Sequence, residues 1–156
     1  MDGLTGAAFP VLNLPAAELS IVESEGKRYV FDPIRKKELV LTPEEWVRQH
    51  LIYFLIEVMR YPKSLFVLER GLMYNQLAKR LDILVVDRAG KPFLIIECKA
   101  PEVTLSQRTL EQVCTYNQRI QAKYIAVSNG LKHVVLGFSS QSQTYIPMKT
   151  FPEFGA

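Results

Sequence analysis

The feature that most constrains this chain is a pair of apolar, β-branched segments that carry charged residues and are joined by a short turn. The segments are RLDILVVD and FLIIECKA, and residues 87–92 between them have turn composition, so together they predict an antiparallel hairpin. A turn centred between Ala89 and Gly90 places Asp82 opposite Glu97. Directly opposed side chains share a face of the sheet, with Cβ atoms roughly 4.5–5.5 Å apart. One metal ion could therefore contact both acids.

The residues that follow Glu97 complete a small polar set. Because successive side chains of a strand point to opposite faces, Lys99 shares the face of Glu97, whereas Cys98 lies on the other face. Mg²⁺ prefers oxygen ligands and is usually held by one or two protein carboxylates plus phosphate oxygens. A lysine beside the ion could orient or deprotonate an attacking water. The pattern predicts a metal-dependent phosphodiesterase site.

Two alternatives stay open at this point. Charged groups are rarely kept among core strands unless they are paired or bind a metal, so a buried salt bridge between Lys99 and either acid also fits the pattern. The second concerns the register, since a single β-bulge would slip the pairing and turn Asp82 to the opposite face.

The order of the polar elements along the chain resembles that of the PD-(D/E)XK nuclease superfamily. A glutamate on a helix is followed by an aspartate, an E-x-K and a helix with Gln-x-x-x-Tyr. Residues 41–130 resemble more closely the N-terminal nuclease domain of type I restriction enzyme R subunits. The segments that carry this resemblance are TPEEWVRQHLIYFLIEVMRYP, KRLDILVV, LIIECKAP, EQVCTY and VSNG. One departure is that Ile83 follows the first acid and no proline precedes it, a variation that the superfamily shows.

The resemblance implies a fold, an activity and a cofactor. The fold would be α/β and restriction-endonuclease-like, with a central mixed β-sheet flanked by helices. The activity would be that of a DNA endonuclease that depends on Mg²⁺ or Mn²⁺. Asp82 and Glu97 would bind the metal, the backbone carbonyl of Cys98 would complete its inner coordination sphere, and Lys99 would be the catalytic lysine.

The resemblance also requires an acid on the first helix, which is either Glu44 or Glu45. Thr42 is a good N-cap, Pro43 suits the first helical position, and Glu45 falls at the third position of a capping box, where it has a structural role. At 100° per residue, Glu44 lies near the apolar stripe of the helix and Glu45 points away from it. We therefore expect Glu44 to be the site residue.

The fourth element of the resemblance falls on a predicted helix over residues 105–121. Gln112 and Tyr116 are four residues apart and share a face with Arg108 and Arg119. This face could steady the site and meet phosphates or bases. An ordinary solvated helix face is the alternative. The same two readings, DNA contact or solvated patch, apply to the basic pair Lys79 and Arg80 just before the first acid of the hairpin.

The predicted organisation is one domain over residues 1–156. Residues 1–17 contain two prolines and are expected to form an extended arm, and residues 18–40 a small hairpin and a linker. A long helix over residues 43–60 ends before Tyr61-Pro62. Further strands are predicted at residues 65–70, 124–128, 133–138 and 144–147, which together fit a mixed sheet in one α/β domain.

Composition agrees with a globular nucleic-acid enzyme. With 48% hydrophobic and 22% charged residues and a net charge of +3, the 156-residue chain can build a core and tolerates a nucleic-acid partner. The two cysteines, Cys98 and Cys114, have no zinc-ligand spacing, and we expect both to be reduced structural thiols of a cytoplasmic protein. Neither a membrane span nor a secretion signal is expected.

The expected partner is DNA, bound by a homodimer or beside other restriction or repair subunits. The chain contains no G-x-x-x-x-G-K-[ST] motif, and 156 residues cannot hold the tandem ATPase motor of a restriction subunit. The leading hypothesis is a stand-alone endonuclease domain without that motor. The alternatives are a non-catalytic module on the same fold, binding DNA or protein, and a regulatory subunit without nucleic-acid contact.

Overall fold

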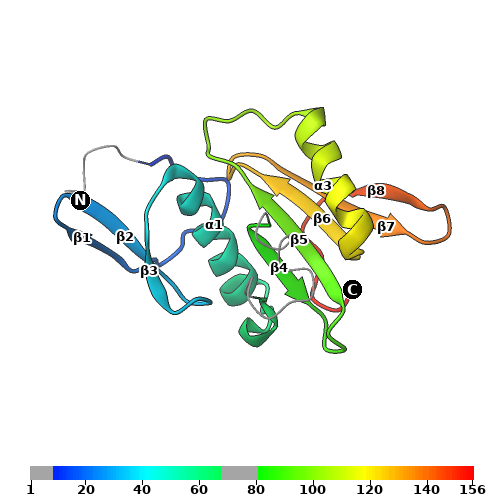
Figure 1. Ribbon diagram of the computed structural model, residues 1–156, viewed down its shortest axis with the longest axis horizontal. Helices are drawn as coiled ribbons and strands as arrows, with labels where there is room; N and C mark the ends of the chain where they lie inside the picture. The colour runs from blue at the N-terminus through cyan, green and yellow to red at the C-terminus, as the bar shows by residue number, and fades with distance from the viewer. Residues whose placement is uncertain (1–8, 68–80) are drawn as a thin grey trace.

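The computed structural model describes residues 9–67 and 81–156, which form a mixed α/β structure (Figure 1). It contains a three-stranded sheet in the order β1-β2-β3 and a five-stranded sheet in the order β4-β5-β6-β7-β8. Within the described ranges, two α-helices, α1 and α3, accompany these sheets. In Figure 1, α1 lies between the two sheets. Among the helices of the described ranges, none combines the length and the apolar character that a membrane span requires.

The small sheet is formed by β1 (Ile21–Ser24), β2 (Lys27–Asp32) and β3 (Lys37–Val40), all antiparallel. The sequence predicts the β1–β2 hairpin but treats β3 as a linker. This strand is short, and its first two residues are charged, as is typical of edge strands that avoid pairing with other chains. The missed strand shows that a short, charged segment has little periodicity to recognise.

The predicted long helix is present, but its winding changes. The α-helix α1 spans Pro43–Tyr53 and continues as one π-helical stretch, η2, over Phe54–Val58. The Met59 N–H donates to the Phe54 carbonyl, five residues earlier. This wider winding departs from the 100° spacing, and Val58, which that spacing assigns to the apolar stripe, is exposed.

The large sheet carries the predicted hairpin at one edge. Its strands are β4 (Ile83–Val86), β5 (Pro92–Cys98), β6 (Tyr124–Ser128), β7 (His133–Ser139) and β8 (Thr144–Met148). Strands β5 and β6 are parallel to each other, whereas the other neighbouring strands of this sheet are antiparallel. A parallel pair needs a crossover connection, and α3 (Gln107–Ile120) supplies it between β5 and β6. The sheet is therefore mixed, as predicted.

The strand expected at residues 65–70 lies only partly within the described residues. There the chain forms a short 3₁₀ helix, η3, over Lys63–Leu65 and a single bridge between Phe66 and Val85. The Val67 N–H also donates to the Leu84 carbonyl. Residues 68–70 lie outside the described part of the chain.

The five-stranded sheet has a hydrophobic core on each face. On β5, Ile96 and Cys98 pack with residues of α1, whereas Ile95 packs with residues of α3. This alternation follows from the two-residue period of a strand. Cys98 is buried, and Cys114 of α3 packs against the second core, as predicted for two structural thiols. The two helices thus cover opposite faces of the sheet.

Candidate metal and DNA-processing site

The register of the β4–β5 hairpin is the predicted one at the end that carries the acids. Ile83 pairs with Ile96 and Leu84 with Ile95, so the next position outward places Asp82 beside Glu97. A β-bulge is present, but it lies between Val85 and Val86, toward the turn. Because the bulge is on the turn side, it leaves the face of the acidic residues unchanged.

Asp82 is held at the start of β4 by both its side chain and its main chain. Its Oδ2 accepts a hydrogen bond of 2.7 Å from the Cys98 N–H. Its main-chain oxygen accepts one of 2.8 Å from Arg48 Nε of α1. A carboxylate oxygen has two lone pairs, so the contact with Cys98 leaves acceptor capacity on the side chain. Among the described residues, no ion pair engages the Asp82 carboxylate.

Glu97 is much less well satisfied. By strand alternation it lies with Lys99 on the face that α3 covers. The Lys99 Nζ is 3.5 Å from Glu97 Oε2. Glu97 Oε1 is buried and has no hydrogen-bond partner among the described residues. A buried carboxylate oxygen without a donor is costly, and a cation is the natural partner for it.

Burial raises the pKa of both acids. The pKa of Asp82 rises to about 6, an increase that the Cys98 N–H opposes and the charge of Glu44 enlarges. The pKa of Glu97 rises to about 7 through burial and, next, through the charge of Asp82, against the lowering effect of Lys99. The charge of Asp82 therefore disfavours the charged form of Glu97, and the charge of Glu44 disfavours the charged form of both acids, which is the electrostatic situation that a divalent cation relieves.

The two candidate helix acids have different surroundings. The Glu45 N–H donates to Oγ1 of the Thr42 cap at 3.0 Å, and Glu45 Oε2 accepts bonds from Arg48 at 2.8 Å and Gln49 at 2.7 Å. Glu44 is exposed, and its charge raises the pKa of both Asp82 and Glu97. Glu45 thus makes structural contacts, whereas the charge of Glu44 acts on Asp82 and Glu97.

These donors fit a hard cation such as Mg²⁺ or Mn²⁺ better than Zn²⁺ or Cu²⁺. Within residues 9–67 and 81–156, no group of three or more His, Cys, Asp or Glu side chains is placed to hold a metal ion. Mg²⁺ keeps several waters and needs only one or two protein carboxylates. The pair of Asp82 and Glu97, with one oxygen lacking a partner, satisfies that smaller requirement. Cys98, whose carbonyl is the third predicted ligand, follows Glu97 directly and is the last residue of β5.

The predicted polar face of α3 lies on the helix that covers the Glu97 side of the sheet. Gln112 is exposed, whereas Tyr116 is half-buried and packs against the core beneath α3. Both line a shallow surface hollow together with Arg108. Arg119, one turn further on, is exposed. The other predicted DNA contacts, Lys79 and Arg80, lie outside the described residues.

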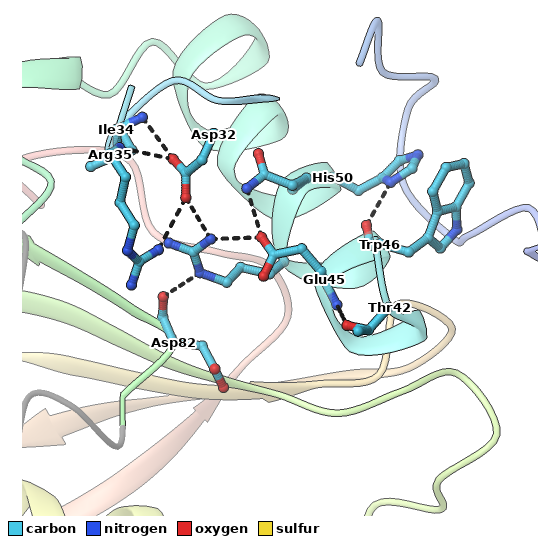
Figure 2. A network of polar contacts seen from close by, with 10 residues as sticks. Asp32, Ile34, Arg35, Thr42, Glu45, Trp46, His50 and Asp82 are labelled. Atoms are coloured by element: carbon cyan, nitrogen blue, oxygen red, sulfur yellow. Dashed lines mark hydrogen bonds and ion pairs between the residues drawn. The ribbon is translucent and has the colours of Figure 1, made fainter. Parts of the chain in front are cut away.

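Sequence reasoning missed a buried charge network on the other side of Asp82. Figure 2 shows Asp32, at the end of β2, facing the same guanidinium group as Glu45 and the main chain of Asp82. That group belongs to Arg48, which is 7% exposed, and Asp32 is fully buried. The signal that could have found Arg48 is a charged residue on the buried side of α1, three residues after Glu45.

The network reverses the effect of burial on Asp32. Burial alone raises the pKa of this acid, but Arg48, with the N–H groups of Arg35 and Ile34, lowers it below its ordinary value. Asp32 Oδ1 accepts the Ile34 N–H at 2.7 Å and the Arg35 N–H at 3.1 Å. Asp32 Oδ2 accepts Arg35 at 3.0 Å and Arg48 at 2.8 Å. Asp32 is therefore a fully paired structural carboxylate.

Comparison with known proteins identifies the family. The family model described as type I restriction enzyme R protein N terminus matches residues 43–152, which is more than half of the chain. No curated protein and no solved structure matches the chain at a significant level. The matched range contains α1, the β4–β5 hairpin with both acids, and α3. The chain belongs to the family of type I restriction enzyme R protein N-terminal domains.

Proposed function

We propose that this protein is a metal-dependent endodeoxyribonuclease that hydrolyses phosphodiester bonds. The observation that carries the proposal is that Asp82 and Glu97 adjoin the Ile83–Ile96 pair at the end of the hairpin, where the charge of Asp82 acts on Glu97 and Glu97 Oε1 is buried without a partner among the described residues. Membership of a restriction-enzyme family supports DNA as the substrate. A restriction-endonuclease-like fold and a single domain over residues 1–156, with an extended arm at 1–17, are part of this proposal.

Each residue of the site has an assigned role. Asp82, Glu97 and the Cys98 carbonyl would hold Mg²⁺ or Mn²⁺, with Glu44 reaching the ion directly or through water. When bound, the ion supplies a Lewis acid that polarises the phosphoryl oxygen and offsets charge on the leaving group. Lys99 Nζ lies 3.5 Å from Glu97 Oε2. As an ammonium group, Lys99 would orient the attacking water. It could accept a proton from that water only in its neutral amine form.

The helix α3 would complete the site on the DNA side. Gln112 and Tyr116 support the reacting groups from the hollow that they line with Arg108. Arg108 and Arg119, with Lys79 and Arg80, would contact phosphates, which position the duplex without reading its sequence. Duplex cleavage needs two scissions, so a homodimer or another restriction or repair subunit is the proposed partner, in the cytoplasm.

One observation supports a different function. The ion pair between Lys99 and Glu97 is what a non-catalytic module on the same fold would retain, with the acids as structural groups. Such a module would bind DNA or protein without cutting. It predicts that divalent cations leave the stability of the protein unchanged, whereas the nuclease proposal predicts stabilisation by an amount that rises with cation concentration.

The experiment is cleavage of supercoiled and linear DNA by the purified chain with Mg²⁺ or Mn²⁺. The variants are Lys99→Ala and Glu97→Gln, and the matched control is Lys91→Ala, an exposed lysine at the turn end of the same hairpin. We expect cleavage that EDTA stops, that both site variants lose by at least about 100-fold, and that the control retains. Equal cleavage by Lys99→Ala and the wild type would contradict the proposal. No cleavage by the wild type would favour the binding module.

A further inference from the structure

One buried arginine joins three parts of the chain at the back of the candidate site. Arg48 Nε donates to the Asp82 main-chain oxygen at 2.8 Å, and its NH1 group donates to Asp32 Oδ2 and to Glu45 Oε2, both at 2.8 Å. Asp32 belongs to β2, Glu45 and Arg48 to α1, and Asp82 precedes β4. The guanidinium is therefore the link between the small sheet, the first helix and the strand that carries the first acid.

We propose that Arg48 is a positioning residue that fixes Asp82 for metal binding, and that Asp32 makes the N-terminal sheet an integral part of the site. The inference rests on the proposed metal-dependent function. It goes beyond the family match, because residues 21–40 of the small sheet lie outside the matched range 43–152. Neither residue would touch DNA or metal.

The geometry explains why an arginine is required. Arginine has five N–H donors in a rigid planar fork, whereas lysine has a single flexible ammonium group. Nε and NH1 of Arg48 point to acceptors on three different segments, which one ammonium group cannot hold in the same geometry. Figure 2 shows the carboxylate of Asp82 turned away from the guanidinium. Arg48 thus holds the backbone of Asp82 and leaves its side chain available.

The charge balance explains why Asp32 is needed. Without Asp32 and Glu45, the buried guanidinium would attract the Asp82 carboxylate, whose pKa its charge already acts to lower, and would compete with a metal ion for it. Asp32 and Glu45 supply two negative charges at 2.8 Å from Arg48 NH1. Together they raise the pKa of Arg48 against the effect of burial. The arginine is therefore satisfied by acids that take no part in metal binding.

The structure offers a reporter for the position of Asp82 that does not depend on activity. The Cys98 N–H donates to Asp82 Oδ2 at 2.7 Å. The N–H of the following residue, Lys99, donates to the Ser128 carbonyl at 2.8 Å and serves as the reference. If Asp82 moves, the Cys98 amide loses its acceptor while the Lys99 amide keeps its own. The ratio of their hydrogen-exchange rates, measured by NMR, isolates the effect on Asp82 from general loosening.

The test compares Arg48→Lys with Arg35→Lys. Both arginines bind Asp32 Oδ2, but only Arg48 bonds to the Asp82 main chain. Arg35→Lys is thus a matched control that disturbs the same buried acid. Asp32→Asn, which preserves size and removes the charge, is measured in parallel so that poor folding of one variant does not end the test. The second readout is the affinity for Mn²⁺, which electron paramagnetic resonance measures.

We expect Arg48→Lys to raise the exchange rate of the Cys98 amide relative to the Lys99 amide and to weaken Mn²⁺ binding by about 10-fold or more. Asp32→Asn should shift both readouts in the same direction. Arg35→Lys should change the exchange-rate ratio and the Mn²⁺ affinity by no more than about 2-fold, as is usual for a conservative substitution outside a site. The inference is overturned if the ratio in folded Arg48→Lys or Asp32→Asn equals that in Arg35→Lys. A wild-type protein that binds no Mn²⁺ would contradict the proposed function, and the exchange ratio would still decide the role of Arg48.

Discussion

Asp32 and Glu97 are both largely removed from water, yet their surroundings differ in almost every other respect. Asp32 accepts four hydrogen bonds, two from backbone N–H groups and two from arginines, and its pKa is lowered. Glu97 has one lysine at 3.5 Å and one oxygen without a partner in the described part of the chain, and its pKa rises to about 7. The difference distinguishes a carboxylate that holds the fold together from one that is available to a ligand.

The contrast also shows how the same helix serves both regions. Arg48 of α1 neutralises Asp32, while it bonds only the main chain of Asp82. Positive charge is therefore concentrated where the acid is structural. Among the described residues, only Lys99 forms an ion pair with either member of the acidic pair of Asp82 and Glu97, so a metal ion would complete the charge balance of this pair.

The largest expected effect is on the paired acid. Asp32→Ala should lower the free energy of unfolding by about 3–5 kcal/mol, because it leaves Arg48 buried beside a single acid and removes two backbone hydrogen bonds. Urea denaturation measures the change, and Glu102→Ala, at an exposed acid, is the control. A loss no greater than that of Glu102→Ala would show that the network does not stabilise the fold.

The pH dependence of stability should separate the two acids. Glu97 has a folded pKa of about 7 against an ordinary value of 4.5, so its protonation stabilises the fold fully below 4.5, and this contribution is lost as pH rises through about 7. The raised pKa of Asp82, about 6, acts in the same direction. Asp32, whose pKa is lowered from 3.8, stabilises the fold above that value and is charged throughout the range from about pH 5 to about pH 8.

The expected result is a metal-free protein that loses on the order of 4 kcal/mol between about pH 5 and about pH 8 through Asp82 and Glu97. His50 contributes with the opposite sign, because burial lowers its pKa and the unfolded chain binds the proton more tightly. The informative quantity is therefore the difference between the wild type and Glu97→Gln in urea denaturation across this range. Identical pH profiles for the two proteins would rule out a raised pKa at Glu97.

A smaller effect is expected when the poorly paired acid is neutralised. Glu97→Gln should raise the stability of the metal-free protein by about 1–2 kcal/mol at about pH 8, since it removes a buried charge whose Oε1 has no partner among the described residues. Its side chain is 19% exposed, and Lys99, 28% exposed, can turn to water. Mg²⁺ should stabilise the wild type and not the variant, which thermal unfolding measures. Equal stabilisation of both proteins by Mg²⁺ would place the metal elsewhere.

The parts of this structure that could be predicted are those with local patterns. The hairpin register could be counted from its turn, because Ile83 pairs with Ile96 and the bulge lies on the turn side. The helix α3 begins after its Ser106 cap and the strand β6 occupies Tyr124–Ser128, both close to the residues predicted. In each case, neighbouring residues determine the outcome through alternation, capping or turn geometry.

The parts that could not be predicted depend on contacts between distant segments. Asp32 and Arg48 are separated by 16 residues, and Arg48 and Asp82 by 34. An ion pair between a strand and a helix produces no periodicity in either segment, so the sequence pattern singles out neither residue. The capping pattern at Thr42 was recognised, but the sequence gives no indication that the Glu45 carboxylate pairs with a buried arginine. Assignment of Glu44 to the site consequently rests on exposure and charge.

The smallest stability change should separate these two neighbouring glutamates. Glu45→Gln should cost about 1 kcal/mol, because it weakens charge-assisted bonds to Arg48 and Gln49. Glu44→Gln should change stability by no more than about 0.5 kcal/mol, as at other exposed positions, and should raise the Mg²⁺ concentration needed for half-maximal cleavage more than Glu45→Gln does. Urea denaturation and a magnesium titration of DNA cleavage measure the two quantities. If Glu45→Gln instead gave the larger shift in Mg²⁺ requirement, the helix acid of the site would be Glu45, and the distinction between structural and ligand carboxylates would not hold on α1.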